Sequence, residues 1–255
     1  MASFTPQNTQ SENVSGTSSV SFSYFKVFLW FALGLAITGV IAFALPDTLV
    51  FMANKLSWTE DVLAKVFMIM IIVSAILMIP SSILMAWKAW RPKSALMLVS
   101  YIVYAVAMGV LLSSVFLTVY ADSLESNTSF IKTVSIAFFV TGGCFLLMGI
   151  IGAFTKKNLG ILIPLVITLV IGAAVISLVN IFLKSSMVYW ITDFVLFGVI
   201  LVITAIDINR VKKIGENGGF SSETNLALYC AYSLYTDFIS IFLRVLFYIM
   251  AHNRK

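Results

Sequence analysis

LGILIPLVITLVIGAAVISLVNIFL, at residues 159–183, contains no charged side chain. A helix needs about 20 consecutive apolar residues to cross the hydrocarbon core of a bilayer, and this stretch is long enough. Because every backbone polar group must be paired inside a bilayer, spanning segments are either helices or strands of a closed barrel. Barrel strands are short and alternate in polarity, which this stretch does not. The stretch therefore predicts a transmembrane helix.

The rest of the chain has the same apolar character. Hydrophobic residues make up 60% of the 255 residues and charged residues 11%, whereas a soluble domain is about one quarter charged. Such a chain could not cover its surface in water, so we expect an all-α integral membrane protein, a bundle of seven transmembrane helices. We place the spans near residues 24–45, 62–87, 94–119, 130–153, 159–183, 187–209 and 224–250.

Little of the chain is expected outside these spans. Residues 1–22 are rich in Ser, Thr, Asn and Gln, so we predict a disordered polar tail. The connections between spans are short, so residues 23–255 are predicted to form a single transmembrane domain. The net charge of +5 comes from short clusters between the spans, which argues against nucleic acid as a partner. The expected surroundings are the lipid bilayer, and the sequence identifies no protein partner.

The distribution of Lys and Arg predicts the orientation, because basic loops of multi-pass proteins face the cytoplasm. Basic residues cluster after the second, fourth and sixth spans, at Lys88, Arg91, Lys93, Lys156, Lys157, Arg210, Lys212 and Lys213. We therefore expect a multi-pass protein of the cell (inner) membrane with a cytoplasmic N-terminus and an extracytoplasmic C-terminus. Arg254 and Lys255 go against the rule at that end. The alternative is six full spans followed by a last segment that folds back.

Ionisable residues inside the spans are the first candidates for function, since each costs roughly 2.5–3.5 kcal/mol on insertion and is usually functional. Four stand well within the spans: Asp193 and Asp207 in the sixth and Asp237 and Arg244 in the seventh. Lys65 and Lys132 lie near span ends, where a long side chain can reach the membrane surface. Asp193 and Asp207 are fourteen residues apart. At about 100° per residue their side chains point within about 40° of each other around the helix axis, so they lie on one face. Asp237 stands in the middle of an apolar run and is the strongest single candidate.

The seventh span carries a polar stripe. Its members follow a spacing of three or four residues and are Cys230, Ser233, Asp237, Ser240 and Arg244. A polar stripe must face protein or water rather than lipid, so we expect the last helix to lie inside the bundle. Glu60 and Asp61, at the predicted outer surface, are candidate partners for Arg244.

Asp207 and Asp237 would interact if their helices face each other. Two carboxylates at short range repel, so the pair would hold one proton between them near neutral pH. When both are ionised, their oxygens could bind a divalent cation, and oxygen ligands of this kind suit Ca²⁺. Asp207 and Asp237 are therefore candidate proton-sensing residues and a candidate metal site on a Ca²⁺ path, with Asp193, Ser233, Ser240 and Arg244 as supporting candidates.

Segments of the second half of the chain carry a family resemblance. They are GAFTKKNL at residues 152–159, SLVNIFL at 177–183, AIDINR at 205–210 and LYCAYSLYTDFI at 228–239. Together they resemble a bacterial member of the transmembrane Bax inhibitor motif family, and the similarity extends from the first span to the end. The chain departs from the family where Ile206 replaces a tyrosine, where Ile208-Asn209 replaces Thr-Gln, and in having no arginine in its second span.

The resemblance implies a seven-helix bundle with the last helix at its centre. It also implies a pH-sensitive calcium leak or channel, in which an aspartate pair in the last two spans senses protons and lines the cation path. The matching positions are Asp207 and Asp237. The resemblance implies no cofactor, and it implies Ca²⁺ as the transported ion.

Other functional classes fit the residues less well. A retinal protein needs a lysine in its last span, and a metallohydrolase needs clustered ligands, but the chain has only His252 and no lysine between Lys213 and Lys255. We therefore do not expect an enzyme. The open alternatives are a proton-coupled secondary transporter of a small solute, with the aspartate pair as its relay, and a membrane scaffold that regulates a partner protein.

Overall fold

The computed structural model describes residues 23–88, 95–125, 128–217 and 223–253. Within these ranges the chain forms helices and no strands. The helices are α1 (Tyr24–Leu56), α2 (Glu60–Lys88), α3 (Ala95–Glu125), α4 (Phe130–Phe154), the short 3₁₀ helix η1 (Leu159–Leu162), α5 (Ile163–Leu183), α6 (Ser186–Asn217) and α7 (Glu223–Asn253). Seven segments of the described chain are helical, long enough and apolar enough to cross a membrane. The predicted all-α bundle is confirmed.

Several helices run past the ends of the predicted spans. α1 passes through Pro46 and ends at Leu56, although proline removes one backbone N–H from the helix. Neighbouring helices and hydroxyl side chains let transmembrane helices tolerate this loss. The predicted N-terminal tail and the last two basic residues, 254–255, lie outside the described residues.

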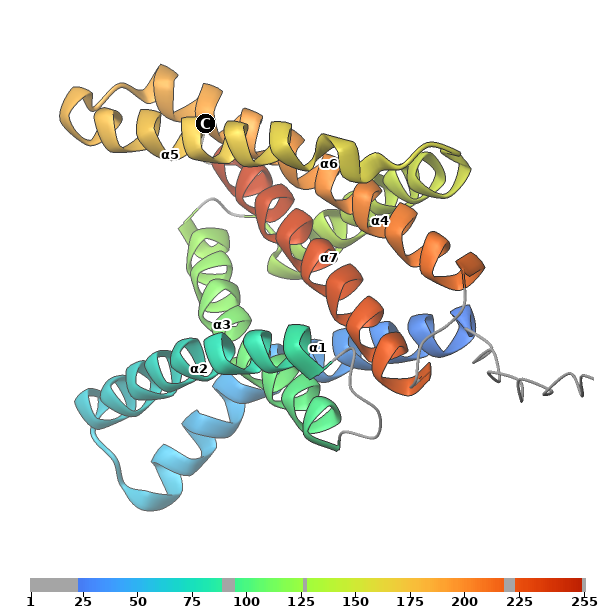
Figure 1. Cartoon of the computed structure of the whole chain (residues 1–255). Helices are drawn as coiled ribbons and strands as arrows, with labels where there is room; N and C mark the ends of the chain where they lie inside the picture. Colours follow the sequence, from blue (N-terminus) through green and yellow to red (C-terminus); the bar gives the residue numbers. More distant parts are fainter. Residues whose placement is uncertain (1–22, 89–94, 126–127, 218–222, 254–255) are drawn as a thin grey trace, which may run out of the picture.

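α7 lies in the middle of the bundle, as Figure 1 shows. It contacts α1, α2, α3, α4 and α6. In its most apolar stretch 56% of the residues are buried, compared with 50% in α3 and 28% or less in the other spans. The prediction that the last helix is central is confirmed. α7 is also one unbroken helix of 31 residues, about 46 Å long at 1.5 Å per residue, so its segment does not fold back.

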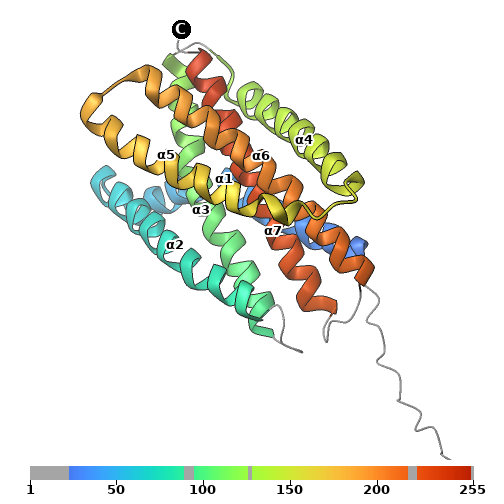
Figure 2. The same ribbon diagram turned by 45° about the horizontal axis from the view of Figure 1, so that its top comes forward.

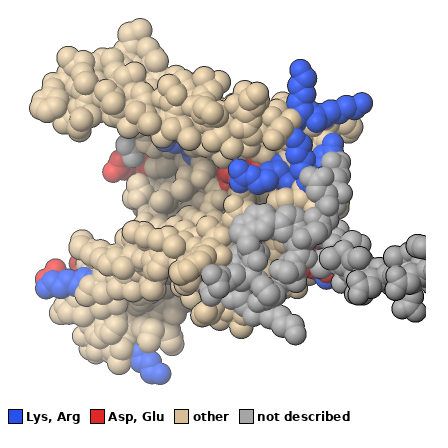
Figure 3. All heavy atoms as spheres, in the orientation of Figure 1, with Lys and Arg blue, Asp and Glu red and all other residues tan. Residues whose placement is uncertain are grey.

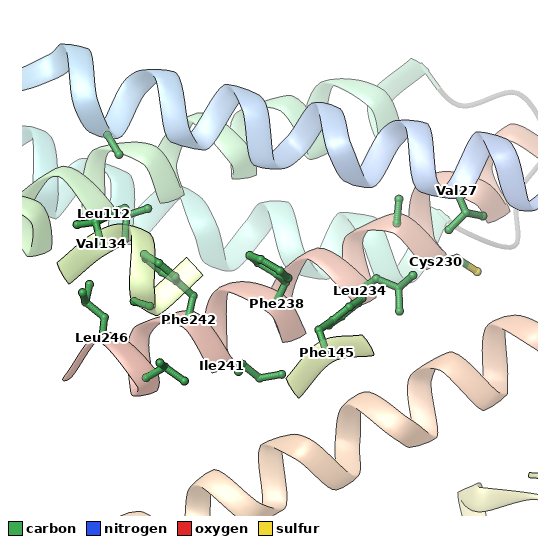
Figure 4. Close-up of a cluster of buried hydrophobic side chains, with 14 of the residues drawn as sticks. Val27, Leu112, Val134, Phe145, Cys230, Leu234, Phe238, Ile241, Phe242 and Leu246 are labelled. Atoms are coloured by element: carbon green, nitrogen blue, oxygen red, sulfur yellow. The ribbon is translucent and has the colours of Figure 1, made fainter. Parts of the chain in front are cut away.

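The other helices form two groups beside α7. α3 packs against α1 and α2, and α6 packs against α4 and α5; Figure 2 shows the α5–α6 pair and the α2–α3 pair on different sides of the bundle. Figure 4 shows side chains of α7 filling the space between α1, α3 and α4. The buried cluster includes Val27, Leu112, Phe145, Leu234, Phe238, Ile241, Phe242 and Leu246. Such close packing holds helices together in lipid, where the hydrophobic effect does not drive one helix to associate with another.

Tyrosine hydroxyls join α7, α1 and α3 inside this packing. Tyr235 of α7 shares a hydrogen bond with the Thr38 hydroxyl of α1 at 2.6 Å, and Thr38 donates to the Ala105 carbonyl oxygen of α3 at 3.0 Å. Tyr101 of α3 donates to a backbone oxygen of α1 at 2.6 Å. Its hydroxyl lies 2.2 Å from where a side chain at Gly34 would begin, so this approach requires glycine.

Basic residues gather at one end of the molecule. In Figure 3 the densest group of blue atoms lies at the right, where α6 ends in Figure 1. Among the residues of this end are Lys156, Lys157, Arg210, Lys212 and Lys213. We call it the basic end. The opposite end contains the α5–α6 turn at Lys184 and Ser185, where Lys184 adopts a left-handed conformation that closes α5.

Candidate functional site

The seam between α6 and α7 brings together two of the predicted site residues, Asp207 and Ser233. The Ser233 hydroxyl of α7 donates a hydrogen bond to Oδ2 of Asp207 on α6. On the other side of this carboxylate, Nη1 of Arg210 lies 3.6 Å from Asp207 Oδ1. Both oxygens of Asp207 therefore have a polar partner, and the carboxylate is held in one position next to α7.

Asp237 lies one helical turn beyond Ser233 on the same face of α7, because residues four apart lie above one another on a helix. Its side chain is buried, and its Oδ2 has no hydrogen-bond partner among the described residues. The charged groups that act on it are Asp207 and Arg210. A buried carboxylate oxygen without a donor is unfavourable, so this position favours a proton or a cation.

The ends of α4 and α6 are fastened together close to Asp207. The Asn209 amide nitrogen donates to the carbonyl oxygens of Gly152 and Thr155, both at 3.0 Å, and its Oδ1 accepts from the Leu159 backbone N–H at 3.2 Å. These bonds satisfy groups at the end of α4 and the start of η1, where helix termini leave backbone groups unpaired. Asp207 is two residues away, so its backbone is fixed by the same contacts.

Gly152 lets α4 and α6 approach closely at this point. An added Cβ there would lie 2.5 Å from the backbone carbonyl oxygen of Ala205. Small residues at helix contacts are what allow such approach in membranes. The spacing of α4 and α6, and with it the position of Asp207, depends on this glycine.

Arg244 and Asp193 form a second charged pair nearer the α5–α6 turn. Nη1 of Arg244 on α7 pairs with Oδ1 of Asp193 on α6. The predicted partners Glu60 and Asp61 were wrong, because the polar face of α7 that carries Arg244 is turned towards α6 rather than towards the start of α2. Asp193 is buried, and its Oδ2 has no hydrogen-bond partner in the part of the chain that the structure describes.

The remaining residues of the predicted stripe do not join either pair. The Ser240 hydroxyl donates to the Thr236 carbonyl oxygen of its own helix at 2.7 Å. Cys230 is buried and is a free cysteine. Sequence reasoning missed the structural part played by Asn209; an amide side chain within an apolar span was the available signal, because such a group must find partners inside the bundle.

The seam offers few ligands for a tightly held metal. Over residues 23–88, 95–125, 128–217 and 223–253, no three His, Cys, Asp or Glu side chains gather into a metal-binding group. Asp207, Asp237 and the Ser233 hydroxyl would supply only part of the six to eight oxygens that Ca²⁺ takes. Water would complete the shell, which suits a passing ion better than a resident one.

Comparison with known proteins connects the whole bundle to one family. The family model described as "Inhibitor of apoptosis-promoting Bax1" matches residues 22–255. The chain is 28% identical over 224 residues to the inner membrane protein YbhL of Escherichia coli K12, covering 87% of this chain and 88% of that one. It is 26% identical to an uncharacterized protein of Borreliella burgdorferi, with the same coverage. An uncharacterized membrane protein of Streptococcus pyogenes is 27% identical over 64% of this chain and 67% of its own.

Proposed function

Because this chain belongs to the Bax inhibitor family of multi-pass membrane proteins, we propose that it is a pH-sensitive calcium leak of the inner membrane, controlled by Asp207 and Asp237. The calcium ion comes from the family resemblance, and the location follows the inner membrane protein YbhL. This chain's own residues support one part of the proposal, namely that an acidic site lies inside the seam between α6 and α7.

One observation carries the proposal: Asp237 keeps a buried carboxylate oxygen for which the described residues supply no donor. Asp207, in contrast, has the Ser233 hydroxyl and Arg210 as partners. The two carboxylates therefore have different tasks. Asp207 is held as a fixed charge, and Asp237 is the group that exchanges a proton for a cation.

This exchange makes the leak sensitive to pH. A protonated Asp237 has no charge to offer a cation, whereas an ionised Asp237 beside Asp207 provides oxygen ligands for Ca²⁺. We expect Ca²⁺ flux to rise as the pair loses its proton and to fall on acidification. In the proposed orientation the basic end faces the cytoplasm, as the distribution of Lys and Arg predicts.

The test is Ca²⁺ entry into sealed liposomes that contain the purified protein and a calcium dye, measured over a range of pH. Wild type should pass Ca²⁺ in a pH-dependent way, and Asp237→Asn should flatten the dependence because its amide does not titrate. Asp47→Asn removes one negative charge from an exposed position on α1 and serves as the matched control. If Ca²⁺ enters liposomes equally slowly with and without the protein at every pH, the leak is ruled out.

A further inference from the structure

A cavity lined partly by polar side chains opens between α5, α6 and α7, away from the aspartate pair. Its volume is about 400 Å³, which is room for several waters or a hydrated cation. The polar residues around it are Ser177 and Asn180 of α5, Tyr189, Thr192 and Asp193 of α6, and Arg244 of α7. These residues lie on the half of the bundle that contains the α5–α6 turn.

Asp193 supplies the reason to regard this cavity as a binding site. Its side chain is 7% exposed and borders the cavity. Arg244 engages Oδ1, whereas Oδ2 finds no donor among the described residues. An anionic oxygen buried without a donor favours any ligand that brings a positive charge.

Arg244 already brings such a charge, but on a long side chain that is 30% exposed. A guanidinium and a divalent cation cannot both occupy the space in front of the same carboxylate without strong repulsion. Arg244 therefore competes with any cation that enters the cavity, and its side chain can withdraw towards the open side.

We propose that Asp193 is a second divalent-cation site, at the mouth of the α6–α7 seam, and that Arg244 is a tethered competitor that occupies it. The identity of the ion and the direction of travel rest on the proposed calcium leak; the site itself does not. Ser177 and Thr192 hydroxyls at the cavity and water would complete the oxygen shell.

The order of residues along α7 places Arg244, with its partner Asp193, on the same helix face as Asp237. Arg244 and Asp237 are seven residues apart on α7, about 10 Å along the helix. Asp207 follows beyond Asp237, next to Ser233. A cation that moved along the seam from Asp193 would therefore pass Asp237 before Asp207.

Equilibrium binding of Mn²⁺ to purified full-length protein in detergent, measured by electron paramagnetic resonance, tests the site without any flux. Mn²⁺ prefers the same oxygen ligands. Arg244→Gln removes the competitor and should bind Mn²⁺ at least about tenfold more tightly than wild type, since a unit charge at contact distance is removed. Arg244→Lys keeps a competing charge and should bind as wild type does. Lys132→Gln removes an exposed positive charge from the start of α4 and should change nothing.

The double variant Asp193→Asn/Arg244→Gln decides whether the ion sits on Asp193. Loss of the gained affinity in the double variant supports the site; retention of that affinity overturns it, as does equal binding by Arg244→Gln and wild type. If gel filtration shows Arg244→Gln unfolded, wild type is compared with Asp193→Asn at high Mn²⁺. If wild type binds Mn²⁺ weakly and Asp193→Asn does not, the inference is supported. If the two proteins bind Mn²⁺ equally, it is overturned.

A flux measurement then separates this inference from the proposed function. In liposomes, Arg244→Gln should admit Ca²⁺ faster than wild type. If Mn²⁺ binds as described but no variant passes Ca²⁺ at any pH, the calcium leak is wrong and the cation site stands. If Ca²⁺ flux is present but Mn²⁺ binding does not depend on Asp193, the leak stands and the site is wrong.

Discussion

Replacing Asn209 with alanine should destabilise the bundle by about 3 kcal/mol. The side chain is 1% exposed and takes part in three hydrogen bonds, two from its amide nitrogen and one to its Oδ1. A typical internal hydrogen bond contributes about 1 kcal/mol net, and alanine would leave the carbonyl oxygens of Gly152 and Thr155 without this donor at the end of α4. Fraying of this end would also loosen the position of Asp207.

The measurement is the free energy of unfolding in mixed micelles of dodecylmaltoside and sodium dodecyl sulfate, followed by tryptophan fluorescence. Asn158→Ala is the matched control, because Asn158 is exposed and its side chain accepts one local hydrogen bond, from the Gly160 N–H at 3.1 Å. We expect the control to lose about 1 kcal/mol or less. If Asn209→Ala is no less stable than the control, the contacts between α4, η1 and α6 do not hold the site in the way described.

Gly152→Ala should destabilise the protein in the same assay, because the added Cβ would lie 2.5 Å from a backbone oxygen. Gly149→Ala on the same helix is the control, since its Cβ would meet only a side chain, at 3.6 Å. This control should be neutral, or stabilising by up to about 1 kcal/mol because alanine has the higher helix propensity. Equal stability of the two variants would contradict the close approach of α4 and α6. Ser233→Ala should cost about 1.5–3 kcal/mol, since its hydroxyl donates to the charged Asp207; Ser233→Thr, which keeps the donor, should cost less. Lys26→Gln breaks an ion pair between α1 and α7 whose lysine is 45% exposed, so thermal stability should change little and only at low salt.

The seven-helix bundle and its central last helix were predictable because lipid penalises exposed polarity so strongly. A long uncharged apolar stretch such as residues 159–183 is typical of a transmembrane helix and of little else. The spacing of Ser233, Asp237 and Arg244 gave the direction of the polar face, and the structure buries that face against α6. These predictions needed only the period of a helix and the cost of polar groups in hydrocarbon.

The partners across helices were not predictable by the same means. Periodicity tells which way a side chain points from its own helix but not which helix packs there, so Arg244 was assigned to the start of α2 instead of to Asp193. Ser240 was counted in the stripe, yet its hydroxyl bonds to its own helix, as serine hydroxyls can within helices. The three contacts of Asn209 join segments far apart in the sequence, and no local pattern encodes such contacts.

The burial of α7 has a consequence for how the protein is made. α7 follows the other six spanning helices of the described chain, so it leaves the ribosome after them, and its mean hydropathy of 1.6 is below the 2.3 to 2.8 of the others. Its charged face is costly in lipid but not against α6, so its release from the translocon should depend on the six helices already present. Charge-neutralising changes on α6 at Asp193 should therefore lower the yield of inserted protein, which protease accessibility in membranes would measure. We therefore expect insertion of α7 and completion of the seven-helix bundle to occur together.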